Sequence, residues 1–271
     1  MTAPVVLRSD ERGIATITLN RPDVLNAMSV ELMESLRSTL VEVAEDPAVR
    51  CVVLRGAGRS FCAGGDFTDI ERRRRSTAES DGPGAVAESY HRLMIRHTES
   101  VSLLRGMPKP TIAVVQGWAV GGGMSLALAA DFRVIASTTQ LRAGFAARSL
   151  SGDFGISWLL VSAVGGARAR DLLMRDRVVD ADTAMQLGLA TTCCAPDDLD
   201  AAATELSAAL AAAPTIALGR MKDNLNAAET YPLSELLVRE SANQRVAATT
   251  SDAREAGLAL AEGRDPIFTG R

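Results

Sequence analysis

The chain has 271 residues, of which 47% are hydrophobic and 23% are charged, and its formal net charge at neutral pH is −4. This is the composition of an ordinary globular protein with enough residues for a full core in one or two domains. The negative balance argues against general nucleic-acid binding.

The sequence has no run of 18 apolar residues, and residues 1–7 lack a basic region followed by an apolar stretch. We therefore expect no membrane span, no signal peptide and a cytoplasmic location. The 4 cysteines have no CxxC spacing, which favours reduced thiols. With only 2 histidines available as imidazole ligands, we expect no metal site.

The N-terminal part predicts a hairpin followed by a helix and a strand. Two short β-rich runs, residues 5–8 and 14–19, flank a polar turn. Ser29 is a helix cap that precedes an apolar face ending near residue 46. A strand is expected at residues 51–54.

Two glycine-rich loops follow predicted strands. The first spans residues 55–66, and the second, residues 116–123, joins the apolar strand 111–115 to an Ala/Leu-rich helix. Glycine at such turns lets a ligand approach the backbone, and the start of the helix offers unpaired N–H groups. An isolated glycine turn is more often a packing feature, but two such loops favour a ligand site lined by backbone.

The segments between and after these loops continue the α/β alternation. Residues 70–85 are polar and predict a mobile loop, which precedes a helix at 86–104. Residues 141–153 read as irregular. Further strands and helices are expected at 132–136, from 156, at 177–179, at 182–187 and at 190–194, followed by C-terminal helices at 200–212, 215–228 and 233–262. The composition shift predicts an α/β core in residues 1–196 and a helical region in residues 197–271.

Three motifs stand at residues 19–28, 60–66 and 117–123, and a fourth stands at the C-terminal residues 265–270. The first three resemble, in order and spacing, motifs of the enoyl-CoA hydratase/isomerase (crotonase) superfamily, and the fourth resembles its C-terminal signature. The resemblance covers nearly the whole chain. It implies an α/β crotonase-like spiral of ββα units, with a C-terminal all-helical trimerisation region that forms a homotrimer or a dimer of trimers.

The resemblance also implies a substrate and its contacts. The substrate is an acyl-CoA, with coenzyme A as part of the thioester and no prosthetic group. By position, the backbone N–H groups of Ala63 and Gly122 form the oxyanion hole. The implied coenzyme A contacts are Val24, Leu25, Gly65, Asp66 and Phe67.

The chain departs from the hydratases of this family at both catalytic glutamates. Ser125 and Phe145 stand at these positions, and neither side chain acts as a general base near neutral pH. The two-glutamate hydration route is therefore disfavoured. We expect Ser125, Phe145 and Trp118 to line the substrate pocket.

Asp153 matches a third acidic position of the family. Dienoyl-CoA isomerases and ring-opening epoxyphenylacetyl-CoA isomerases, which this arrangement resembles, place an aspartate at this position. Aroyl-CoA dehalogenases also have an aspartate there and use it as a nucleophile. Aromatic walls such as Phe145, Phe154 and Trp118 are expected to raise the pKa of Asp153 by desolvation. The alternative role for Asp153 is a helix N-cap, since it precedes an apolar helical run.

Other candidates have weaker support. His97 lies close to where dehalogenases keep a general base, although a lone helical histidine is usually solvated or capping. Arg72 to Arg75 are candidates for coenzyme A phosphate contacts or are a solvated run. The family's C-terminal basic residue falls on Gly263, beside Arg264, which puts a coenzyme A contact from a neighbouring subunit in doubt.

Three functions follow from this pattern. The first is an acyl-CoA isomerase that shifts a double bond or opens a ring, with Asp153 as acid and base. The second is a hydratase-like enzyme, or a CoA-thioester hydrolase or dehalogenase with Asp153 as the nucleophile. The third is a catalytically silent acyl-CoA-binding subunit.

Overall fold

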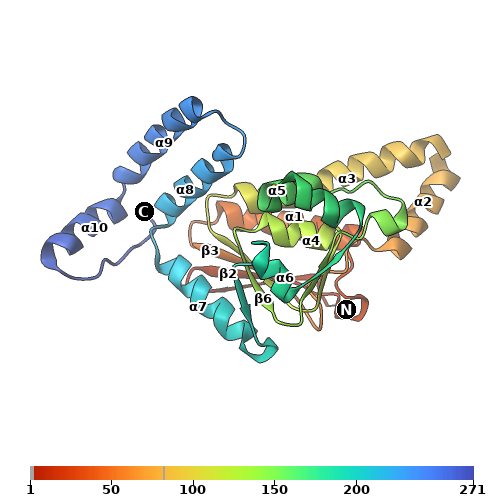
Figure 1. The fold of residues 1–271 in the computed structure, drawn as a ribbon, viewed down its shortest axis with the longest axis horizontal. Helices are drawn as coiled ribbons and strands as arrows, with labels where there is room; N and C mark the ends of the chain where they lie inside the picture. The colour runs from red at the N-terminus through yellow and green to blue at the C-terminus, as the bar shows by residue number, and fades with distance from the viewer. Residues whose placement is uncertain (1–2, 82) are drawn as a thin grey trace.

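The computed structural model describes residues 3–81 and 83–271. A six-stranded sheet with the order β1-β2-β3-β4-β6-β9 lies at the centre (Figure 1). Only β1 and β2 pair antiparallel, as the predicted hairpin, and every later neighbour in this sheet pairs parallel. The strands are β1 (Val6–Glu11), β2 (Ile14–Leu19), β3 (Cys51–Gly56), β4 (Thr111–Val115), β6 (Phe132–Ala136) and β9 (Thr192–Cys194).

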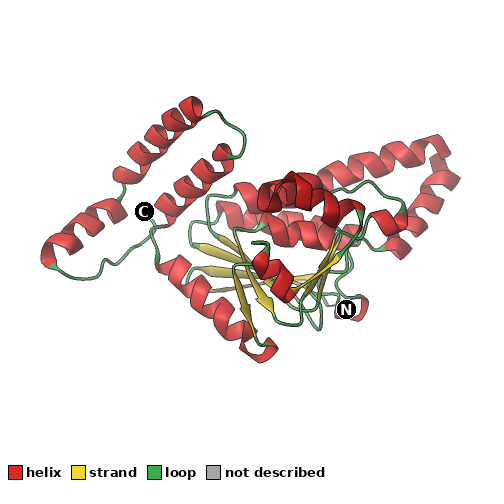
Figure 2. Ribbon diagram, viewed as in Figure 1, coloured by secondary structure: helices red, strands yellow, loops and turns green. Residues whose placement is uncertain are grey.

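Helices cover both faces of this sheet (Figure 2). Alternate residues of β3 point to opposite faces, so Val52 and Leu54 join one apolar cluster while Cys51 and Val53 join another. The first cluster takes most of its helical residues from four helices, and the second takes its helical residues from α7 (Leu199–Ala212). The helices of the first layer are α1 (Val30–Glu45), α3 (Pro83–Gly106), α4 (Gly122–Ala129) and α5 (Ile156–Met174).

A second sheet of three short strands lies beside the main one. Its strands are β5 (Trp118–Val120), β7 (Gln140–Arg142) and β8 (Val178–Asp180), and α6 (Ala181–Gln186) follows β8. The prediction of irregular structure from residue 141 was therefore wrong at β7. Three residues are too few to show the alternation that identifies a strand.

The predicted mobile loop at 70–85 was also wrong. The chain forms α2 (Phe67–Asp81), and α3 begins at Pro83; residue 82 lies outside the described residues. Charged pairs spaced three and four residues apart stabilise α2, including Asp69 with Arg73 and Glu71 with Arg75. The polar run is therefore a charged helix.

The C-terminal region contains one more helix than expected. The predicted helix at 233–262 is divided into α9 (Leu233–Ala248) and α10 (Ser251–Glu262). The Thr250 hydroxyl caps α10 by accepting from the N–H of Ala253 at 3.0 Å, which marks a new helix start. α7 packs against the main sheet, whereas α8 (Thr215–Ala228), α9 and α10 project away from it (Figure 1).

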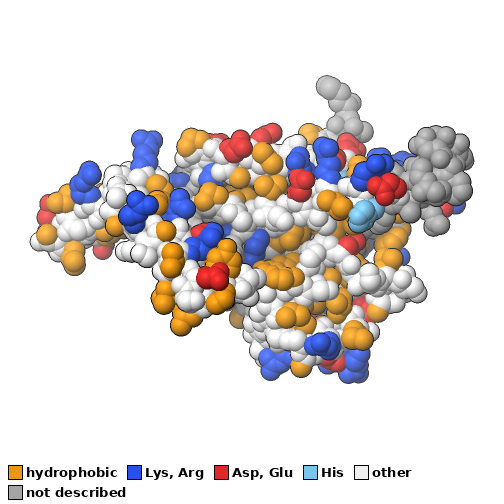
Figure 3. Space-filling model, turned by 90° about the horizontal axis from the view of Figure 1, so that it is seen from above, with side chains coloured by type: hydrophobic (Ala, Val, Ile, Leu, Met, Phe, Trp, Pro, Cys, Tyr) orange, Lys and Arg blue, Asp and Glu red, His pale blue; other side chains and the backbone are white. Residues whose placement is uncertain are grey.

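The projecting helices expose many apolar side chains, some of which are visible as orange groups on the left of Figure 3. The large exposed residues of α8–α10 are Met221, Leu225, Leu233, Leu237, Val238, Leu258 and Leu260. Within the described ranges, no single helix has the length and apolar content of a membrane span. The segments Pro196–Ala212 and Thr215–Ala228 have the required length and apolar content only when they are taken together, and the chain bends by 104° between them.

Candidate active site

The two glycine-rich loops lie against each other. The first loop pairs with β5, because the Cys62 N–H donates to Trp118 O at 3.0 Å and the Val120 N–H donates to Cys62 O at 2.9 Å. A Cβ added at Gly64 would lie 2.8 Å from Val120 O, and one at Gly123 would lie 2.4 Å from Cys62 O. Glycine is therefore required on both sides for the loops to approach this closely.

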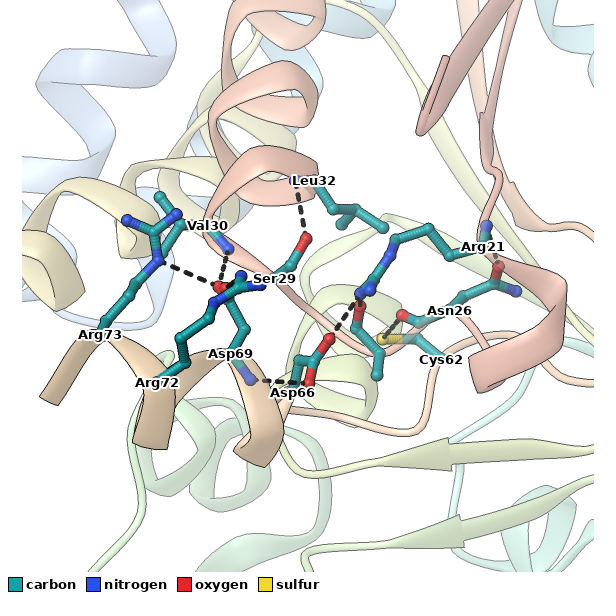
Figure 4. A network of polar contacts seen from close by, with 11 residues as sticks. Arg21, Asn26, Ser29, Val30, Leu32, Cys62, Asp66, Asp69, Arg72 and Arg73 are labelled. Carbon is teal, nitrogen blue, oxygen red and sulfur yellow. Dashed lines mark hydrogen bonds and ion pairs between the residues drawn. The ribbon is translucent and has the colours of Figure 1, made fainter. Parts of the chain in front are cut away.

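Asn26 holds the first glycine-rich loop in place, and Figure 4 shows it beside Arg21 and Cys62. Its side chain is fully buried, and its Nδ2 donates to Ala57 O and Ser60 O at 2.9 Å and to Phe61 O at 3.2 Å. Its Oδ1 accepts from the Arg21 N–H at 2.8 Å. Sequence reasoning placed Asn26 in a motif but missed this positioning role, because nothing in the sequence tells which backbone carbonyls surround a side chain.

Asn26→Ala is expected to lower the free energy of unfolding by about 1–3 kcal/mol, because it leaves several buried carbonyls without a donor. The backbone of Asn26 also has φ = 56°, which Asn tolerates better than Ala. Urea denaturation measures the change. Asn20→Ala is the control, since it removes one exposed bond to Pro4 O and is expected to cost less than about 0.5 kcal/mol.

A network of charged side chains joins the starts of α1 and α2 (Figure 4). Asp66 pairs with Arg21 at 2.9 Å and accepts from the Asp69 N–H at 3.1 Å, so its carboxylate has structural partners at the start of α2. Asp69 accepts from the Val30 N–H at 3.1 Å and pairs with Arg72 and Arg73.

Burial raises the pKa of Asp69, but the hydrogen bond from Val30 and the pairing with Arg73 and Arg72 outweigh it and hold this pKa below its usual value. Asp69 therefore stays ionised. Arg72 and Arg73, which we considered for phosphate contacts, already have this carboxylate as a partner.

A cavity of about 110 Å³ opens between these loops, α2, α3 and the segment before α5. Its polar lining consists of exposed backbone at both glycine loops and four titratable side chains, Asp69, His97, Arg148 and Asp153. The remaining lining is predominantly apolar, which suits an apolar acyl group. The larger apolar lining residues are Met28, Val30, Met33, Phe67, Ile70, Leu93, Met94, Val120, Phe145, Leu150 and Phe154.

The structure contradicts the assignment of Ala63 as an oxyanion-hole donor. Its N–H donates to Leu25 O at 2.9 Å, so it has no hydrogen to offer a ligand. The backbone of Met28 bonds to both neighbours of Gly65: its N–H donates to Gly64 O, and its carbonyl accepts from the Asp66 N–H. The Gly65 N–H therefore points away from Met28. Sequence position alone did not distinguish Ala63 from Gly65, because the direction of each N–H depends on the backbone conformation of the loop, where Gly64 has φ = 85°.

Gly122 is the first residue of α4, where N–H groups have no partner within the helix. The first backbone bond of this helix runs from the Ser125 N–H to Gly121 O at 3.0 Å. Within the described part of the chain, neither Gly65 nor Gly122 has an acceptor for its N–H. Both residues line the cavity, so two amides without an acceptor lie on adjoining loops at its wall.

Asp153 lines the cavity and is not a helix cap. The N-cap of α5 is Gly155, and no side chain caps this helix. Among the described residues, no hydrogen bond or ion pair engages the Asp153 carboxylate, and burial raises its pKa. The carboxylate is therefore a stronger base than a solvated aspartate.

His97 lines the same cavity from α3 and is only 4% exposed. Its Nε2 lies 3.6 Å from Glu34 Oε1. Burial lowers the pKa of His97, and the nearby Glu34 carboxylate opposes this only in part. His97, which had weaker support in the sequence than Asp153, thus lies at the same site.

The other predicted pocket and coenzyme A residues are divided between the cavity and its surroundings. Phe145 and Gly65 line it, and Phe67 lines it with its ring 3.9 Å from the Arg148 guanidinium. Trp118 and Ser125 are not among its lining residues.

Trp118 lies on β5 and is 37% exposed, while Ser125 is fully buried in α4 with its Oγ directed to Gly121 O at 3.4 Å. Val24 and Leu25 also lie outside the cavity, at the short helix Pro22–Val24, where Val24 is 46% exposed. A coenzyme A contact at Val24 and Leu25 remains a prediction.

Comparison with known proteins places this geometry in a family. Residues 9–271 match the model of the family described as enoyl-CoA hydratase/isomerase. The chain is 35% identical to the 1,2-epoxyphenylacetyl-CoA isomerase of Escherichia coli K12, covering 98% of each protein. It is also 35% identical to the probable enoyl-CoA hydratase EchA12 of Mycobacterium tuberculosis H37Rv, covering 98% of this chain and 92% of that one. Among solved structures, a putative enoyl-CoA hydratase from Streptomyces coelicolor A3(2) superposes with a TM-score of 0.90 at 35% identity, covering 98% of this chain and 94% of that one.

Proposed function

Because the chain belongs to the enoyl-CoA hydratase/isomerase family, we propose that it is an acyl-CoA isomerase in which Asp153 moves a proton along the acyl chain of a thioester. The observation that carries this proposal is the unpaired Asp153 carboxylate in a cavity that also holds the free amides of Gly65 and Gly122. The fold is the mixed α/β crotonase fold with C-terminal helices that the family's solved structures share.

The proposed reaction needs a base and a site for negative charge. The thioester oxygen accepts from the Gly65 and Gly122 N–H groups, and Asp153 takes a proton from a carbon next to the thioester. The resulting enolate is stabilised by the two amides, which are fixed before the reaction by the packing of the loops. Return of a proton to another carbon shifts the double bond, or opens a strained ring if the substrate carries one.

Two features favour isomerisation over hydration. Ser125 and Phe145 carry no carboxylate to activate water, and the second cavity carboxylate, Asp69, is held by two arginines. The relatives are named both as isomerases and as hydratases, and one of them acts, by its name, on epoxyphenylacetyl-CoA. The apolar cavity lining is compatible with an aryl or alkenyl acyl group.

The test is hydrogen exchange in deuterated water. The protein is incubated with 3-enoyl-, 2,5-dienoyl- and aryl-acetyl-CoA esters, and deuterium uptake and product formation are followed by mass spectrometry. We expect exchange with at least one ester and its loss in Asp153→Asn.

Other outcomes support the alternatives. A covalent ester trapped on Asp153 contradicts the proton-transfer role and supports a nucleophile, as in a hydrolase or dehalogenase. Binding of the esters without exchange or turnover, unchanged in Asp153→Asn, supports a catalytically silent acyl-CoA-binding subunit.

We also propose that α8–α10 form an interface between copies of the chain, as a homotrimer or a dimer of trimers. The exposed apolar residues on these helices are too numerous for a solvated surface, since residues such as Leu233 and Val238 are 70% and 72% exposed. Light scattering after size exclusion is expected to give three or six copies. A monomer at micromolar concentration would contradict the proposal.

A further inference from the structure

The four titratable side chains of the cavity differ in their partners. Asp69 is engaged by the Val30 N–H and two arginines, and the Arg148 guanidinium lies over the Phe67 ring. Within the described residues, the side chains of Asp153 and His97 have no hydrogen bond of normal length, and His97 Nε2 is buried without a hydrogen-bond partner. Two groups that carry a proton are therefore available at one apolar cavity, which is more than a single-base reaction requires.

His97 lies near Glu34 of α1 and one turn before Val101 on α3. Its Nε2 lies 3.6 Å from Glu34 Oε1 of α1, so Nδ1 is the ring nitrogen with no carboxylate partner among the described residues. One turn further along α3, the Val101 side chain lies 3.9 Å from the position of a Cβ at Gly155. Since His97 and Val101 share a face of α3, His97 lies beside the segment that carries Asp153.

We propose that His97 is a second proton-transfer group of this site, which returns to the acyl chain the proton equivalent that Asp153 removes, with Glu34 as its positioning residue. This inference rests on the proposed isomerase function. In the reacting form the pair holds one proton, on His97. The Asp153 carboxylate takes a proton from one carbon, and the C–H electron pair enters the enolate. The imidazolium then gives its Nδ1 proton to the other carbon.

The step leaves a protonated Asp153 and a neutral His97, and a proton passes back between them through solvent before the next turnover. Burial supports this exchange, because it raises the pKa of Asp153 and lowers that of His97, so the two pKa values approach each other. When one group removes the proton and another returns it, the two reacting carbons can also lie further apart than a single carboxylate reaches.

The test compares His97→Gln with His91→Gln in the full-length protein. His91 lies on the same helix and is exposed, so it controls for the substitution itself. Two quantities are measured with the ester that exchanges best: deuterium uptake into substrate, which reports removal by Asp153, and formation of the isomer. A substrate deuterated at the reacting carbon, in ordinary water, reports how much label reaches the new position.

We expect His97→Gln to lower isomer formation by at least about tenfold while uptake changes less than about threefold. The share of label carried to the new position is expected to rise, since Asp153 alone must then return what it removed. Glu34→Gln, which changes a partly exposed side chain, is expected to lower isomer formation several-fold and to raise the share of label carried to the new position in the same way.

Unchanged isomer formation in His97→Gln overturns the inference. So does a parallel fall of uptake and isomer formation with unchanged label transfer, which indicates a structural role. Absence of exchange in the wild-type protein with every ester overturns the proposed function instead, and that result differs from exchange that does not depend on His97.

Discussion

Asp153→Asn is expected to lower kcat for isomerisation by about 10²–10⁴, the range that a positioned general base contributes. The amide has nearly the same size as the carboxylate and accepts no proton, so the cavity and the two glycine amides stay in place. The dissociation constant of a non-reacting acyl-CoA is therefore expected to change little. Steady-state kinetics and calorimetric titration measure the two quantities.

Asp197→Asn is the matched control for this variant, because Asp197 is exposed on the short helix Pro196–Asp198 and does not line the cavity. Equal activities of the Asp153→Asn and wild-type proteins would remove Asp153 from the mechanism. Loss of acyl-CoA affinity in parallel with activity would show that the carboxylate supports the cavity rather than the proton transfer.

The same substitution has a predicted effect on stability. Burial raises the pKa of Asp153 in the folded chain above its unfolded value, so the ionised form costs folding free energy. This cost is absent below the unfolded pKa and develops as the pH rises through the folded pKa. Asp153→Asn is therefore expected to raise the free energy of unfolding at pH 7 and to leave it nearly unchanged at pH 3. Thermal unfolding at both pH values gives the comparison.

Strand and helix positions in the core could be predicted because buried residues recur in the sequence with the period of a strand or a helix. The apolar face of α1, from Leu32 to Val43, and the apolar run of β4 match the structure. The prediction failed where stability comes from something other than apolar burial. In α2 the stabilising pairs join charged residues, and the start of α10 depends on one cap at Thr250.

The candidate site could be predicted only in part. The motifs identified both glycine loops and Asp153, because these residues are recognisable in sequence. They did not show that Ala63 donates to Leu25 O, nor that a helical histidine faces the cavity. Both facts depend on which way a group points after folding, and residue order carries little information on that.

The second large effect is expected at Gly122, whose N–H can be removed without removing a side chain. Proline has no N–H, and at the first residue of a helix its fixed φ is tolerated. A Cβ at Gly122 would lie 2.6 Å from Met28 Cε and 3.0 Å from its Sδ, so the substitution needs room. The designed pair is therefore Gly122→Pro and Gly122→Ala, each combined with Met28→Ala.

Both double variants add a Cβ in the same place and lack the same methionine side chain, so they differ by the amide hydrogen and by the ring carbons Cγ and Cδ that replace it in proline. We expect the proline variant to have a kcat about 10²–10³ below that of the alanine variant, the effect of losing one oxyanion donor. Deuterium uptake should fall by a similar factor, because the enolate forms before the proton is returned. If both variants are equally active, the Gly122 N–H does not bind the developing charge, and the α4 turn is a packing feature that brings Gly123 against Cys62.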